Sequence, residues 1–220
     1  MNIVNQFPIV GMFSKRYRFY SEKRKEYYSR NNEIRNRVNL LKRTEIDTAK
    51  DSYISPTIIM PFGAKFGSTK YDIKQSLGKP DYILVDSGIP NHQVFFYKKR
   101  AENYRYLLQI HFIDDKMIYA MNRFKTKDLL ESTEDLFRIA NLLVEKYIGK
   151  SLSVDDSIDA TIVDSENNKI AISGILELRV RYISGDISLL DISKNNNNLK
   201  KKASKDIYFK NMLSSLMSFL

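Results

Sequence analysis

The spacing of apolar and polar residues predicts a long helix near the N-terminus. Residues 14–43 contain neither Gly nor Pro, and most of their positions hold Lys, Arg, Asn or Glu. Apolar residues recur among them at the spacing of one helical stripe. That stripe consists of Tyr20, Tyr27, Ile34, Val38 and Leu41. The pattern therefore predicts an amphipathic helix whose polar face is basic.

A second, shorter helix is predicted to begin near Lys70. Ser68 or Thr69 is the expected N-cap, and Gly78 ends the segment. The stretch before it is rich in Gly, as in a phosphate-binding P-loop, but a P-loop places Lys directly after its second Gly. Here Lys70 comes three residues after Gly67, so we interpret the stretch as the start of a helix.

Strand patterns follow each of two predicted helices in the middle of the chain. One short strand, 57–60, is predicted before the first helix. The strands predicted after it are 81–86, 93–97 and 104–124, the last with a hairpin turn at Asp114-Asp115. The second helix is expected at 128–148. The segments after it are 160–164, 169–173 and 176–192, with a turn at Ser184-Gly185. Both halves thus follow the order helix, strand, strand, long strand.

The predicted fold class is therefore α+β, with two successive helix-then-three-strand antiparallel units flanked by N- and C-terminal amphipathic helices. The predicted divisions are a basic helical arm, a first unit, a second unit, and a Lys/Asn-rich linker with a final helix. Their boundaries are 1–50, 51–125, 126–193 and 194–220. This tandem pattern favours one continuous sheet, or two related ones, over unrelated domains.

Residues 62–124 carry a short motif that resembles a known family. Phe66-Gly67-Ser68-Thr69 precedes the helix from Lys70 to Ser76, and Leu77-Gly78-Lys79-Pro80-Asp81 follows it. The segment resembles the SmpA/OmlA (BamE-like) domain, and two such units in tandem resemble β-lactamase inhibitor protein. The resemblance implies a helical lead, a three-stranded antiparallel sheet, and a sheet surface that binds other proteins. BamE-like proteins are lipid-anchored, whereas this chain has no Cys, so the resemblance concerns the fold.

The net charge of +10 is concentrated at the two ends of the chain. Residues 15–43 carry a net +8 and residues 194–220 a net +5, while residues 51–193 carry −2. The basic N-terminal face either lies in solvent or contacts nucleic acid or an anionic membrane, with interleaved aromatic rings available to stack on bases. The candidate contact residues are Lys15, Arg16, Arg18, Lys23, Arg24, Lys25, Arg30, Arg35 and Arg37.

The C-terminal segment has apolar residues at helical spacing after its Lys/Asn-rich linker. This face either packs on the parent fold or docks into a partner. The candidate docking residues are Phe209, Met212, Leu213, Leu216, Met217 and Leu220.

The residue types that carry chemistry are sparse. Without Cys there is no disulfide, thiolate metal site or Cys nucleophile. His92 and His111 lack a metal-ligand spacing, and the acidic positions do not match a calcium-binding loop. Those acidic positions are Asp155, Asp156, Asp159, Asp164 and Glu166. We therefore predict no catalytic, metal or cofactor site and no small-molecule substrate.

The leading hypothesis is a non-catalytic protein-binding or scaffold protein, with a protein partner or a second copy as its ligand. One alternative is a nucleic-acid-associated protein that uses the basic aromatic N-terminal helix. Another is a peripheral membrane protein that attaches through Phe7 to Phe13 and the same helix. We read no signal peptide and no apolar run of membrane-spanning length, so a cytoplasmic location is expected.

Overall fold

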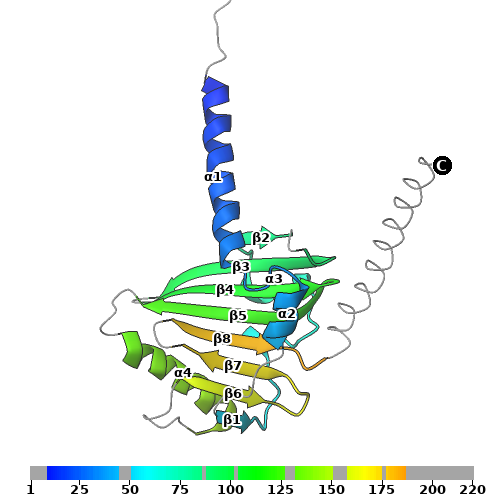
Figure 1. The fold of residues 1–220 in the computed structure, drawn as a ribbon, viewed down its shortest axis with the longest axis vertical. Coiled ribbons are helices and arrows are strands. Elements are labelled where there is room, and N and C mark those ends of the chain that lie inside the picture. The colour runs from blue at the N-terminus through cyan, green and yellow to red at the C-terminus, as the bar shows by residue number, and fades with distance from the viewer. Residues whose placement is uncertain are drawn as a thin grey trace, which may run out of the picture.

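A computed structural model describes residues 9–44, 51–85, 88–101, 104–126, 132–150, 158–174 and 177–186. These residues form one mixed sheet of eight strands in the order β1-β6-β7-β8-β5-β4-β3-β2 (Figure 1). The strands are β1 (Asp51–Ile54), β2 (Tyr82–Leu84), β3 (His92–Ala101), β4 (Tyr104–Ile113), β5 (Lys116–Thr126), β6 (Asp159–Val163), β7 (Lys169–Ser173) and β8 (Leu178–Ile183). Only β1 and β6 pair in parallel; the other neighbouring strands are antiparallel.

Helices lie on both faces of this sheet, so the fold is α+β. The helical elements are α1 (Ile9–Asn31), α2 (Arg37–Thr44), the 3-10 turn η1 (Pro61–Gly63), α3 (Lys70–Leu77) and α4 (Ser132–Ile148). Buried residues of α3 and α4 share one apolar core with one face of the sheet. The end of α1, the α1–α2 link and α2 bury side chains against the opposite face.

The expected pair of helix-then-three-strand units is wrong. The strand after α1 and α2, β1, pairs in parallel with β6 at one edge of the sheet. At the centre, β5 pairs directly with β8, so all the described strands belong to one hydrogen-bonded ladder. Periodicity along the chain shows which residues are in strands, but the order of strands is set by long-range hydrogen bonds that leave no local pattern.

Several local predictions are confirmed. The helix after the Gly-rich stretch is α3, whose N-cap Thr69 and first-turn Asp72 form a reciprocal capping box. The turn at Asp114-Asp115 joins β4 to β5, and both residues have positive φ, at 47° and 68°. Such a left-handed pair is the usual two-residue hairpin connection because its twist matches that of the strands.

The predicted N-terminal helix is interrupted at Asn32, so it forms α1 and α2 rather than one rod. The Asn32 side chain accepts a hydrogen bond from the backbone amide of Ile34 at 3.1 Å and donates one to its carbonyl at 2.9 Å. Asn side chains compete with the helical backbone in this way. The break turns Ile34 into the core, where it is fully buried, and leaves Tyr20 and Val38 of the predicted stripe exposed.

Helix α1 leaves the sheet at β2 and projects away from it (Figure 1). Its C-terminal end is held by Tyr28, whose ring stacks on Tyr82 at 4.5 Å and contacts Phe96 at 4.9 Å. Buried aromatic pairs of this kind add to the energy of apolar burial. One end of the helix is therefore fixed to the sheet. Among the described residues, no helix is both long and apolar enough to cross a membrane.

Candidate anion-binding site

A cavity of about 350 Å³ lies where α1 turns into α2 above strands β5 and β8. Five of its nine lining side chains are arginines, and one is a carboxylate. The lining consists of Arg30, Asn31, Asn32, Glu33, Arg35, Asn39, Arg43, Arg123 and Arg179. We call this the arginine pocket. Its walls come from three stretches of chain that are far apart in the sequence.

Gln109, fully buried on β4, holds the α1–α2 corner above the sheet. Its side-chain amide donates to the carbonyl of Asn31 at 2.6 Å, and its side-chain oxygen accepts from the backbone amide of Glu33 at 3.1 Å. The helix break leaves backbone groups without helical partners, and a buried polar group needs a partner of its own. The two hydrogen bonds give partners both to the backbone of the corner and to the buried side chain of Gln109, and they fix the roof of the pocket.

The floor of the pocket contains two arginines directly opposite each other. Arg123 on β5 and Arg179 on β8 are register partners in the antiparallel pair. Like charges placed opposite each other across strands are destabilising. The pair is stabilised by Glu177, which receives a hydrogen bond from Arg179 at 3.0 Å and lies 3.7 Å from Arg123. Lys125 also binds Glu177, at 2.8 Å.

The carboxyl of Glu177 is charged in this setting. Burial would raise its pKa, but hydrogen bonds from Lys125 and Arg179 and the charge of Arg123 hold the pKa below its usual value. A carboxylate that is bound on several sides has little capacity left for further cations. Glu177 therefore neutralises part of the floor and leaves the remaining guanidinium groups facing the cavity.

The pocket keeps an excess of positive charge after its internal ion pairs are counted. Arg30 pairs with Glu26 on α1, and Arg43 and Arg179 lie 3.0 and 4.0 Å from Glu33. Five arginines and Lys125 thus face three carboxylates: Glu26, Glu33 and Glu177. Guanidinium groups bind phosphate and carboxylate through paired N–H donors, so this arrangement is suited to hold an anion.

The structure brings only two of the predicted contact residues into the pocket, Arg30 and Arg35. Arg35 donates to the backbone carbonyls of Asn32 at 3.4 Å and Arg30 at 2.7 Å, so it also stabilises the corner. The others lie elsewhere on the two helices. Lys23, Arg24 and Lys25 are exposed on α1, Arg37 is half-buried at the start of α2, and the side chains of Lys15, Arg16 and Arg18 are outside the described part.

Three pocket arginines were missed by the sequence analysis: Arg43, Arg123 and Arg179. Arg179 alternates with apolar residues along β8, a signal that it leaves the core face. Nothing in that alternation indicates that β8 lies beside β5. The predicted docking residues Phe209, Met212, Leu213, Leu216, Met217 and Leu220 lie outside the described residues.

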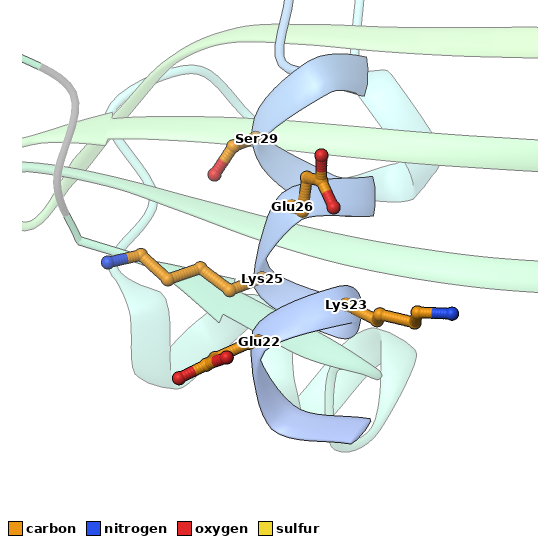
Figure 2. A pocket seen from close by; sticks show the side chains of 5 residues that line it. All are labelled: Glu22, Lys23, Lys25, Glu26 and Ser29. Carbon is orange, nitrogen blue, oxygen red and sulfur yellow. The ribbon is translucent and has the colours of Figure 1, made fainter. Parts of the chain in front are cut away.

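A larger hollow, of about 520 Å³, lies along α1 but does not form a chemical site. Its lining is contributed by a single helix: Glu22, Lys23, Lys25, Glu26 and Ser29. Figure 2 shows these side chains leaving the helix in different directions. Opposite charges that diverge in solvent cannot converge on one ligand, so this hollow is part of the outer surface of the helix.

The two histidines form a buried pair on the sheet. His92 Nε2 lies 3.0 Å from His111 Nδ1, and their rings stack at 5.2 Å. Burial lowers the pKa of His92 to about 4, and burial together with the nearby His92 lowers the pKa of His111. No group of three or more potential metal ligands is found among the described residues. The pair therefore contributes to the core.

The acidic positions of the β6–β7 turn also have a structural role. Asp164 is buried and accepts hydrogen bonds from the backbone amides of Ile59, Glu166 and Asn168, at 2.7, 2.9 and 2.9 Å. Asp164 therefore stabilises the β6–β7 turn and joins it to the segment that contains Ile59. Residues 57–60 do not form the strand that was predicted for them. The backbone amide of Ile59 donates its hydrogen bond to Asp164 in this turn instead of to a neighbouring strand. Asp155 and Asp156 lie outside the described residues.

Comparisons with known proteins do not identify a family for this chain. No protein-family model matches the chain, and no curated protein matches it. A solved structure of a cysteine-rich secretory protein from Staphylococcus aureus matches with 10% identity and a TM-score of 0.36. The match covers 64% of this chain and 52% of that protein. So weak a likeness supports no inference about function.

The resemblance to BamE-like proteins and to a tandem unit as in β-lactamase inhibitor protein is corrected by these results. The described strands form one eight-stranded mixed sheet with a parallel edge, not a helix-then-three-strand repeat. The short motif of Gly and Leu-Gly-x-Pro therefore marks the capped helix α3, which has Gly78 as its C-cap. It does not identify a family.

Proposed function

We propose that this protein is a non-catalytic nucleic-acid-binding protein that holds backbone phosphates in the arginine pocket. The observation that carries the proposal is the convergence of five arginines, from α1, the α1–α2 link, α2, β5 and β8, on one cavity with an excess of positive charge. Phosphate contacts supply most of the affinity of proteins that bind nucleic acid without reading its sequence.

Helix α1 favours a chain of phosphates over a single small anion. Lys23 is exposed on the same helix that brings Arg30 to the pocket, and its position seven residues earlier, about two helical turns, places it on the same face as Arg30. At 1.5 Å per residue Lys23 lies about 10 Å from Arg30 along the helix axis. A strand with regularly spaced charges can occupy both places at once. The exposed rings of Tyr20 and Tyr27 could stack on bases of a single strand.

The sequence-based preference for a protein partner rested on the lack of a catalytic set of residues and on the amphipathic segments at both ends of the chain. The C-terminal one lies outside the described residues. An acidic protein segment would also bind arginines. It competes with nucleic acid for the same pocket, and the binding experiment separates the two. Nucleic acid is preferred here because the arginine forks, a further cation on the same face of α1 and exposed tyrosines match a phosphate backbone with bases.

The test measures binding of a fluorescein-labelled single-stranded oligonucleotide by fluorescence anisotropy over a series of salt concentrations. The variants Arg123→Gln and Arg179→Gln remove pocket cations, and Arg138→Gln removes an exposed cation from α4 on the opposite face. We expect the wild-type affinity to fall steeply with salt. Each pocket variant should weaken binding several-fold and reduce the salt slope by about 0.7, whereas Arg138→Gln should do neither.

Three results would contradict the proposal. The oligonucleotide does not bind, or it binds without salt dependence, or Arg138→Gln weakens binding as much as the pocket variants do. Equal or tighter binding of poly-glutamate of matched length, lost in the same pocket variants, would assign the pocket to an acidic protein partner instead. Circular dichroism and a thermal unfolding scan on each variant ensure that folded proteins are compared.

A further inference from the structure

One carboxylate stands inside the arginine pocket without the geometry of a strong ion pair. The Glu33 side chain is 11% exposed and lies 3.0 Å from Arg43 and 4.0 Å from Arg179. The atom that lies 3.0 Å from the Arg43 guanidinium is Oε2, which is buried, and this contact does not have the geometry of a hydrogen bond; Oε2 forms no other hydrogen bond within the described part of the chain. By contrast, Glu177 in the floor receives good hydrogen bonds from both Lys125 and Arg179. Glu33 is thus close to guanidinium groups without saturating them.

The backbone at this position is held in place by contacts with the sheet. The amide of Glu33 donates to the buried side chain of Gln109, and the next residue, Ile34, is fully buried in the core. Glu33 therefore remains in the pocket whether or not a ligand is present. An incoming phosphate must either displace its carboxylate from Arg43 and Arg179 or bind beside it against electrostatic repulsion.

We propose that Glu33 is a built-in competitor for the ligand phosphate, which lowers the affinity of the pocket and selects for polyanions. This inference rests on the proposed function. A carboxylate and a phosphate use the same guanidinium donors, so each excludes the other. A strand that also contacts the cations of α1 can offset this competition with several charges at once, and a single free phosphate cannot.

The variant Glu33→Gln tests the competitor directly, because it removes the charge and keeps the size of the side chain. Glu145→Gln is the matched control, since Glu145 is an exposed carboxylate on α4 and its loss changes the net charge equally. We expect Glu33→Gln to bind the same labelled oligonucleotide about tenfold more tightly, the order expected for one like charge in a half-buried site. Glu145→Gln should remain within about twofold of the wild type.

Inorganic phosphate provides a second readout in the same assay. We expect wild-type binding of the oligonucleotide to resist competition by inorganic phosphate, after correction for ionic strength. Glu33→Gln should be inhibited at concentrations about tenfold lower, because the pocket then accepts a single phosphate. Glu33→Met, which has similar length and no charge, repeats the test if Glu33→Gln unfolds below the assay temperature.

The outcomes separate this inference from the function on which it rests. If the oligonucleotide binds and depends on Arg179, but Glu33→Gln and Glu33→Met bind no more tightly, the competitor role is refuted and the proposed function stands. The same holds if Glu145→Gln gains as much as Glu33→Gln, since net charge alone would explain the gain. If neither the wild type nor the Glu33 variants bind the oligonucleotide, the proposed function fails, and the inference fails with it.

Discussion

Mild acid should destabilise this protein before its carboxylates begin to protonate, because of the buried His92–His111 pair. His92 is 1% exposed, His111 is fully buried, and the pair shares one contact of 3.0 Å between ring nitrogens. Tyr119 packs its ring edge-on against His111 at 5.1 Å. The second ring nitrogen of His111 has no hydrogen-bond partner among the described residues, so a proton added there would be poorly solvated.

The size of the effect follows from the lowered pKa values. His92 has a folded pKa of about 4 against an ordinary value of 6.5. The unfolded chain therefore binds more protons than the folded one as pH falls, and stability is lost from about pH 6.5 downward, through the folded pKa. His92 alone should lower the free energy of unfolding by about 2 kcal/mol between pH 7 and pH 5. His111 shifts in the same direction and adds to the loss.

Urea unfolding followed by circular dichroism at half-unit steps from pH 7.5 to 5 measures this loss. Above pH 5 the ordinary carboxyl groups remain charged, so the histidines dominate the change. Histidine ring signals in NMR spectra report their protonation in the folded state over the same range. A free energy of unfolding that is constant between pH 7 and 5, or a His92 ring that titrates near pH 6.5 while folded, would refute the reasoning.

Two further predictions concern buried polar side chains that hold the fold, one under the α1–α2 corner and one in the β6–β7 turn. Gln109→Leu should lower the free energy of unfolding by about 2–4 kcal/mol, measured by urea unfolding, because two hydrogen bonds to the α1–α2 corner are lost and their partners stay buried. Asp164→Asn should cost about 2–3 kcal/mol, since an amide cannot replace all the acceptor sites that bind Ile59 and its own turn. The exposed Asp159→Asn on β6 is the control, and a cost equal to that of Asp164→Asn would contradict the role of the turn.

The elements that the sequence predicted well are those whose interactions span only a few residues. The capping box of Thr69 with Asp72 lies within three positions, and the hairpin at Asp114-Asp115 joins strands that are adjacent in the chain. The predicted helix at 128–148 is α4, whose alternation of buried and exposed residues follows the helical repeat. In each case the residues that decide the structure are neighbours in the sequence.

Only part of the arginine pocket could be predicted from the sequence, because its residues come from segments that are far apart in the chain. Arg30 and Arg35 were found because a basic helix has a local signature, although the break at Asn32 that brings Arg35 next to Arg30 was not. Arg123 and Arg179 are separated by more than fifty residues and become partners only through the β5–β8 ladder. Charge counts had placed the positive charge at the two ends of the chain and a nearly neutral body between them.

The sequence by itself therefore determined the α+β class, the capped helix α3, the hairpin between β4 and β5 and the basic character of the N-terminal region. Only the tertiary structure decided the strand order, the projection of α1 and the meeting of five arginines in one pocket. Local elements follow from side-chain periodicity and from hydrogen bonds between near neighbours. The pocket depends on hydrogen bonds and charge contacts between distant segments, which exist only after the sheet has formed.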